Sequence, residues 1–248
     1  MIDGVIDGGE LHMLGRASGA HGEVALRRRT AADGSAVTEL IVDGVFAMDD
    51  VDTSTERALA TEALRRCPGG RLRVLVGGLG LGWTAATVLA EPRVAAVDVA
   101  ELQPALVGWA ADGLLPGLPA LPADRLALHV TDVAAQLAGA PGHWDAVLLD
   151  VDNGPAFLVH QSNAGLYSDA GLTTALAALR PGGVLAIWSA DPVPELAGRL
   201  AALPGTADVE HLLLPVEREG RRFDHAIVVA RRAGLSGSSG RAAGPGQR

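Results

Sequence analysis

The stretch Val76-Gly77-Gly78-Leu79-Gly80-Leu81-Gly82-Trp83-Thr84 decides the fold. Three of its glycines, Gly78, Gly80 and Gly82, follow an apolar run at Leu72–Val76 and precede a helical pattern. A glycine-rich turn between a strand and a helix lets the backbone approach a ligand, and the first N–H groups of the helix face that ligand. The stretch therefore predicts a nucleotide site at this strand–helix junction, with the three glycines in contact with the ligand.

Strand-like and helix-like runs alternate on both sides of this turn. The strand-like runs are short and continuously apolar, as is typical of strands with helices on both faces. Such alternation predicts parallel βαβ units with right-handed crossovers, and hence a Rossmann-like, doubly wound, mostly parallel α/β sheet of seven strands. The expected strands are Leu72–Val76, Val94–Ala100, Leu126–Val130, Ala146–Leu149, Val184–Trp188, Glu210–Leu214 and His225–Ala230, and the expected helices are Thr53–Arg66, Trp83–Ala90, Pro104–Ala111 and Leu172–Leu179.

The two ends of the chain follow other patterns. Two β-like runs, Val24–Arg29 and Val37–Val42, flank a segment that contains Asp33-Gly34, and Asp-Gly between such runs indicates a hairpin. We therefore predict a small antiparallel β unit over residues 1–52 and a Rossmann-like domain over residues 53–232. Residues 233–248 are rich in Gly and Ser without periodicity, which predicts a disordered tail.

Composition excludes several classes of function. The sequence has no lysine, so all 20 basic residues are arginines, and neither Schiff-base catalysis by lysine nor a P-loop is available. A net charge of −9 argues against a nucleic-acid partner. One cysteine and seven scattered histidines predict no metal site. No apolar run approaches the roughly 20 residues of a membrane span, and no signal peptide is visible, so we expect a cytoplasmic protein without a membrane partner.

Acidic residues end three consecutive expected strands: Glu101, Asp132 and Asp150. Ligands of open parallel sheets bind beyond the carboxyl ends of the strands, so these acids should converge on the glycine turn. Glu101 could reach ribose hydroxyls, and Asp132, beside Val133, could accept a hydrogen bond from an adenine amine. Each acid alone could instead cap a helix. A dinucleotide and an adenosyl-sulfonium are both compatible with this arrangement.

Side chains outside these motifs are weaker candidates for the same pocket. Trp83 and Trp188 lie near expected strand ends and could contact adenine, although core packing explains them equally well. His160, Gln161 and Asn163 follow the segment after Asp150 and could line the pocket, although a loop that faces solvent is the simpler interpretation.

Four segments carry a resemblance to a known family: the glycine-rich Leu72–Thr84, the acidic motif at Glu101, the segment ending at Asp132, and Trp144–Pro155. Over roughly residues 40–190 they resemble the spermidine synthase family, which has the class I methyltransferase-like fold. The resemblance implies that Glu101 holds ribose and Asp132 holds adenine. It also implies that Asp150 orients the attacking amine and takes its proton. The further substrate-binding residues that it implies are Asp152, which would also assist catalysis, Asn153 and Tyr167.

The resemblance implies a homodimeric transferase that binds decarboxylated S-adenosylmethionine or S-adenosylmethionine, without a metal. Such an enzyme would move an aminopropyl or related alkyl group to a small-molecule amine. The sequence differs from the family at Leu81, where an acid usually helps to hold the donor's propylamine. A methyltransferase acting on a small molecule with S-adenosylmethionine is therefore a second interpretation, and a nucleotide-binding homologue without catalysis is a third. The acids available before the first strand of the sheet as amine anchors are Asp49, Asp50, Asp52 and Glu56.

Overall fold

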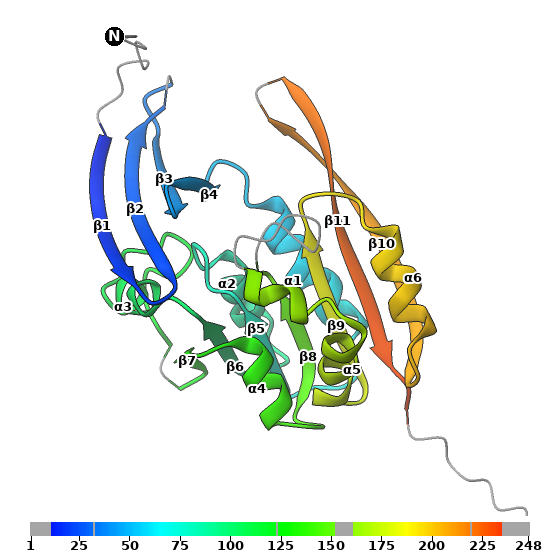
Figure 1. Ribbon diagram of the computed structural model, residues 1–248. Coiled ribbons are helices and arrows are strands. Elements are labelled where there is room, and N and C mark those ends of the chain that lie inside the picture. Colours follow the sequence, from blue (N-terminus) through cyan, green and yellow to red (C-terminus); the bar gives the residue numbers. More distant parts are fainter. Residues whose placement is uncertain (1–10, 32, 123, 152–160, 219, 235–248) are drawn as a thin grey trace, which may run out of the picture.

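The computed structural model describes residues 11–31, 33–122, 124–151, 161–218 and 220–234. Within these residues the strands form two sheets, one of four strands and one of seven. Figure 1 shows the smaller, N-terminal sheet, in blue, beside one end of the larger sheet. The predicted division into a unit over 1–52 and a domain over 53–232 stays a prediction, and most of the predicted tail lies outside the described residues.

The seven-stranded sheet is mostly parallel, as predicted. Its strand order is β10-β11-β9-β8-β5-β6-β7, and the pairs among β5, β6, β7, β8 and β9 are all parallel. The order reverses between β5 and β8, and ligands of such sheets bind at this point. The strands are β5 (Leu72–Gly77), β6 (Val94–Glu101), β7 (Leu126–Val130), β8 (Trp144–Leu149), β9 (Leu179–Ser189), β10 (Thr206–Arg218) and β11 (Arg221–Arg232).

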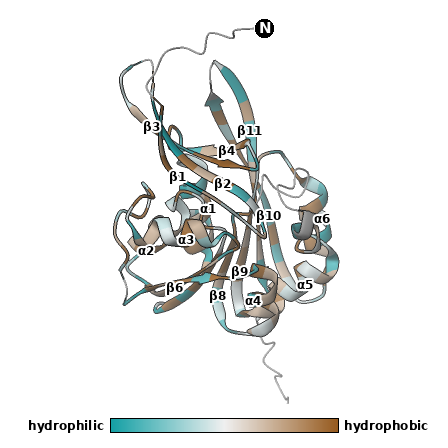
Figure 2. Cartoon of the chain, turned by 60° about the vertical axis from the view of Figure 1, so that its left-hand side comes forward, coloured by the Kyte–Doolittle hydropathy of each residue, from teal (hydrophilic) through white to brown (hydrophobic). Residues whose placement is uncertain are grey.

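Helices cover both faces of this sheet. Successive residues of a strand point to opposite faces, so Val74 packs in one hydrophobic cluster and Leu75 in another. The first cluster includes residues of α1–α3, and the second includes residues of α4–α6. Figure 2 shows hydrophobic residues along the central strands that these helices cover. The helices are α1 (Ser54–Arg66), α2 (Trp83–Ala90), α3 (Pro104–Ala111), α4 (Val133–Gly139), α5 (Asp169–Ala178) and α6 (Pro194–Ala202), with a 3-10 helix at Gln161–Gly165.

The N-terminal sheet is antiparallel, as predicted, and it contains two strands besides the two β-like runs found in the sequence. Its order is β1 (Leu11–Gly19), β2 (Gly22–Thr30), β3 (Ala36–Val42) and β4 (Val45–Asp49). The turn at Gly34, where φ is +83°, joins β2 to β3 as predicted. The sequence did not reveal the two further strands, because β1 is mostly exposed and β4 has only five residues.

The N-terminal sheet packs on the core of the larger sheet. Leu26, Leu40 and Val42 belong to the same hydrophobic cluster as Val74 of β5. Close packing also joins β1 to α3, because a Cβ atom on Gly15 would lie 2.5 Å from the ring of Trp109. No helix in the described part of the chain is long and apolar enough to cross a membrane.

Candidate active site

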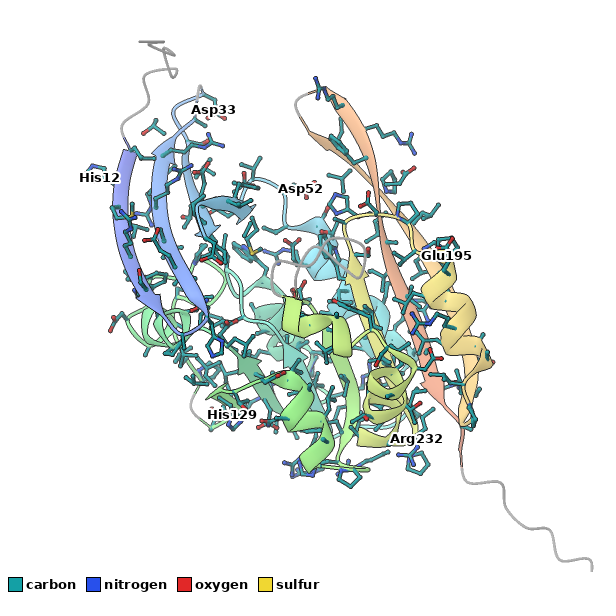
Figure 3. The ribbon with its side chains drawn as sticks, viewed as in Figure 1. His12, Asp33, Asp52, His129, Glu195 and Arg232 are labelled. Atoms are coloured by element: carbon teal, nitrogen blue, oxygen red, sulfur yellow. The ribbon has the colours of Figure 1, made fainter. Side chains whose placement is uncertain are left out.

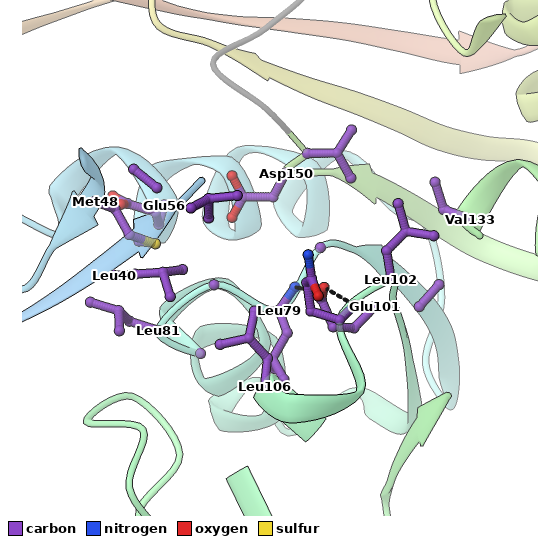
Figure 4. Close-up of a pocket in the computed structure, with 18 of the residues that line it drawn as sticks. Leu40, Met48, Glu56, Leu79, Leu81, Glu101, Leu102, Leu106, Val133 and Asp150 are labelled. Carbon is purple, nitrogen blue, oxygen red and sulfur yellow. Dashed lines mark hydrogen bonds between the residues drawn. The ribbon is translucent and has the colours of Figure 1, made fainter. Parts of the chain in front are cut away.

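A pocket of about 160 Å³ lies beyond the carboxyl ends of β5, β6 and β8, next to the N-terminal sheet (Figure 4). The position is the one expected from the strand order. Most of the wall is apolar, and every predicted glycine contributes to it. The residues that line it are Leu40, Val42, Ala47, Met48, Glu56, Gly78, Leu79, Gly80, Leu81, Gly82, Trp83, Ala100, Glu101, Leu102, Gln103, Leu106, Thr131, Val133, Asp150, Val151, Asn163 and Trp188.

The glycine turn needs glycine at its three pocket positions. The φ angles of Gly78, Gly80 and Gly82 are +88°, +49° and +90°, which other residues rarely adopt. A Cβ atom on Gly78 would also lie 2.2 Å from the main-chain oxygen of Asp150, and one on Gly80 would lie 2.8 Å from Met48 Sδ. The turn is therefore shaped to bring three separate segments of the chain together around the pocket.

Glu101 orders the backbone on two sides of the pocket. It is buried at the end of β6, and its Oε2 accepts a hydrogen bond from the Leu79 amide at 2.8 Å. Its Oε1 accepts another from the Gln103 amide at 2.8 Å (Figure 4). One carboxylate thus holds both the glycine turn and the start of the connection to α3, and it still borders the pocket.

Asp132 caps a helix. Its Oδ1 accepts a hydrogen bond from the Ala134 amide at 2.8 Å, at the start of α4. The neighbours Thr131 and Val133 line the pocket, whereas Asp132 is not among the lining residues. The predicted contact between Asp132 and adenine stays a prediction. The helix was missed although Asp132 is a favourable N-cap residue before an apolar run, a signal that could have revealed α4.

Asp150 ends β8 and borders the pocket. Its Oδ2 accepts a hydrogen bond from the Thr84 hydroxyl at 2.5 Å. Burial raises the pKa of Asp150 to about 6, and the hydrogen bond from Thr84 opposes this rise. A carboxylate with such a pKa is ionised at neutral pH and can accept a proton more readily than an exposed aspartate.

Glu56 also lines the pocket, in the first turn of α1. Burial, followed by the negative charge of Asp150, raises its pKa to about 7. The sequence identified Glu56 only as one of four possible amine anchors, and the other three are not among the lining residues. Figure 3 shows Asp52 in the connection before α1. Those three accept hydrogen bonds from nearby backbone amides: Asp49 from Val51, Asp50 from Thr38 and Asp52 from Ser54.

The remaining candidates fall into three groups. Trp83, Trp188 and the buried Asn163 line the pocket. Tyr167 is buried behind the wall, where its hydroxyl donates a hydrogen bond to the Val151 carbonyl at 3.0 Å. It therefore fixes the backbone at the edge of the pocket. The predicted Asp152, Asn153 and His160 lie outside the described residues.

The charged residues that line the pocket in the described part of the chain are all acidic: Glu56, Glu101 and Asp150. A mostly apolar pocket with carboxylates at a few positions favours a ligand that is apolar in part and carries positive charge. No group of three or more potential metal ligands occurs among the described residues.

Comparisons with known proteins identify this fold. The sequence matches no protein-family model and no curated protein. Its structure is similar to that of a spermidine synthase in complex with the transition state analogue AdoDATO, with a TM-score of 0.72, 16% identity and coverage of 89% of this chain and 73% of that chain.

Two further solved structures are similar. The spermidine synthase from Thermotoga maritima has a TM-score of 0.71 and 16% identity, with coverage of 89% of this chain and 72% of that one. A probable spermidine synthase from Corynebacterium glutamicum has a TM-score of 0.61 and 18% identity, with coverage of 88% and 79%. The resemblance found in the sequence is thus confirmed at the level of structure, and this chain has the fold of the spermidine synthases.

Proposed function

We propose that the protein is a transferase that moves an aminopropyl or related alkyl group from an adenosyl-sulfonium donor to a small-molecule amine. One observation carries the proposal: Asp150, an acid able to accept a proton, borders the same pocket as the glycine turn and Glu101. The similarity in structure to spermidine synthases supports this class of reaction. In this proposal the nucleoside lies between the glycine turn, Glu101, Asp132 and Val133.

The proposed reaction needs an uncharged amine close to the carbon beside the sulfonium. Asp150 would orient the amine and take a proton from its ammonium form. The amine nitrogen then forms a bond to that carbon, and the carbon–sulfur bond breaks with its electron pair going to sulfur, which leaves a neutral thioether. Holding both reactants in line in a pocket with few polar groups would provide much of the acceleration. Asp152, Asn153 and Tyr167 stay proposed as substrate-binding residues, with Asp152 assisting.

The charges of the pocket favour decarboxylated S-adenosylmethionine as the donor. S-adenosylmethionine carries a carboxylate, which the three acidic lining residues would repel, whereas the decarboxylated form lacks this group and keeps the positive charges of its sulfonium and ammonium. One observation favours the second candidate function, a methyltransferase: the side chain at position 81 is an apolar leucine, fully buried, which would not bind a propylammonium group.

Calorimetry with both donors separates the two candidates. Aminopropyl transfer requires tighter binding of decarboxylated S-adenosylmethionine, and a clear preference for S-adenosylmethionine would favour the methyltransferase. A protein that binds either donor but yields no alkylated amine in any mass-spectrometric assay would be a binding homologue. We also propose a homodimer and the division of the chain near residue 52, which sedimentation and limited proteolysis would test.

A further inference from the structure

The pocket brings together two carboxylates that are 94 positions apart in the sequence. Glu56 lies in the first turn of α1, and Asp150 lies at the end of β8. Thr84 connects them, because its hydroxyl donates to Asp150 Oδ2 at 2.5 Å and also lies 3.4 Å from the main-chain oxygen of Glu56. Both acids line the pocket, and the charge of each is unfavourable to the other (Figure 4).

The surroundings of Glu56 do not neutralise it. The Thr55 hydroxyl donates a hydrogen bond to its Oε2 at 2.9 Å, while Asp150 and Asp52 are the neighbouring negative charges. The adjacent Arg57 lies over the ring of Trp83, at 4.7 Å, and its Nε donates to Thr53. Among the residues that the structure describes, none of those lining the pocket is basic, and two carboxylates in such a pocket are costly unless a proton or a bound cation lies with them.

We propose that Glu56 and Asp150 together bind one ammonium group of the acceptor, and that Glu56 is a second proton acceptor of the reaction. This inference rests on the proposed function and adds a residue from α1 to it. The acceptor enters as an ammonium ion, and Asp150 takes its first proton. The free amine then attacks the donor carbon, the carbon–sulfur bond breaks toward sulfur, and Glu56 takes a proton from the secondary ammonium ion that results. Both acids release their protons to solvent after the product departs. A base whose pKa lies near 7 suits this step at neutral pH.

The test compares Glu56→Gln with two other variants. Glu56→Asp keeps the charge and should restore part of the function. Glu62→Gln is the matched control, because Glu62 lies on the same helix but pairs with Arg65 and Arg66. The probes are a series of primary amines from 1,3-diaminopropane to 1,5-diaminopentane, titrated calorimetrically with 5′-methylthioadenosine present, and 5′-methylthioadenosine alone as an uncharged nucleoside.

We expect Glu56→Gln to weaken binding of the best amine about tenfold or more, in line with the loss of a charge-assisted hydrogen bond. Binding of 5′-methylthioadenosine should stay within about twofold, which also shows that the variant is folded, and Glu62→Gln should change neither affinity. Amine affinity in Glu56→Gln equal to that of the wild type, or wild-type protein that binds none of the amines, overturns the inference.

The proposed function has a separate point of failure. Wild-type protein that binds neither adenosyl-sulfonium donor would overturn the proposed function. The role of Glu56 is tested separately, by the effect of Glu56→Gln on the affinity for the amine. If turnover can be measured, the acidic limb of the pH profile of kcat/KM should move in Glu56→Gln, while a purely structural role would lower kcat/KM equally at all pH values.

Discussion

The Thr84 hydroxyl donates a hydrogen bond to Asp150 Oδ2, which joins the first turn of α2 to the end of β8. This bond stabilises the ionised carboxylate and opposes the effect of burial on its pKa. Thr84→Val keeps the shape of the side chain but removes the donor, so the pKa of Asp150 should rise further. We expect the acidic limb of the pH–rate profile to move up by about one pH unit. Thr84→Ser keeps the hydroxyl and should leave the limb in place, and an unmoved limb in Thr84→Val would contradict the role of the bond.

Asp150→Asn should separate catalysis from stability. Because folding raises the pKa of Asp150 to about 6, its ionisation costs folding free energy as the pH rises from about 4 through 6. The variant should therefore be more stable than the wild type at pH 8, by about 1–2 kcal/mol, and equal to it near pH 4. Turnover should fall by about 10²–10⁴. Urea unfolding at the two pH values and a rate assay check both parts, and unchanged turnover would remove Asp150 from the mechanism.

Glu101→Gln should weaken nucleoside binding and the fold together. The carboxylate accepts from two backbone amides, and an amide side chain has only one oxygen, so one buried N–H loses its partner. We expect a loss of about 1–3 kcal/mol in stability and roughly tenfold weaker binding of 5′-methylthioadenosine. The exposed Glu195 on α6 (Figure 3) offers a control, since Glu195→Gln should change neither quantity. Normal stability in Glu101→Gln would contradict this account of the turn.

Gly78→Ala should disrupt the turn through backbone strain and a clash. The added methyl would lie 2.2 Å from the Asp150 main-chain oxygen, at a φ angle of +88°. We expect a destabilisation of at least 1–3 kcal/mol and loss of nucleoside binding. In contrast, Gly108 is exposed in helix α3 with open space at its Cβ position, so Gly108→Ala should stabilise the protein by about 0.5–1 kcal/mol. Equal melting temperatures for the two variants would be inconsistent with the turn described above.

Tyr167→Phe should make the backbone at the edge of the pocket less rigid while the buried aromatic ring stays in place. The variant loses the hydrogen bond from the phenol to the Val151 carbonyl but keeps the buried ring. We expect a loss of about 0.5–1.5 kcal/mol in stability, measured by chemical unfolding. KM for the amine should rise because Val151 lines the pocket, whereas nucleoside affinity should stay unchanged. A large loss of nucleoside affinity would instead place Tyr167 in the cofactor site.

Much of the larger sheet could be predicted because its signals are local. The structure has helices α2 and α3 and strand β7 within the predicted bounds, since glycine, proline or polar residues flank each apolar run. Strand β9 begins at Leu179 rather than Val184, because pairing of Trp144 with Leu179 on the neighbouring strand extends it through a Pro-Gly-Gly segment that reads as a turn. Register with a neighbour is tertiary information that the periodicity of one segment does not contain.

The same distinction applies to the candidate site. The glycine turn, Glu101 and Asp150 could be predicted to converge, because the carboxyl ends of parallel strands meet at one edge. The place of Glu56 could not, since it depends on how α1 packs against the sheet. The apolar wall formed by Leu40 and Met48 was also missed, because it depends on the docking of the N-terminal sheet.

Because of that wall, a bound nucleoside should also stabilise the fold. Leu40 and Met48 come from the first fifty residues, while the glycine turn and the acids come from the large sheet, so a ligand in the pocket contacts both parts at once. The bound ligand would hold the two parts together non-covalently. It would add RT ln(1 + [L]/Kd) to the free energy of unfolding, where [L] is the free ligand concentration and Kd its dissociation constant. The two sheets should then melt as a single cooperative unit when the pocket is filled, and resistance to proteolysis between β4 and α1 should increase with ligand concentration.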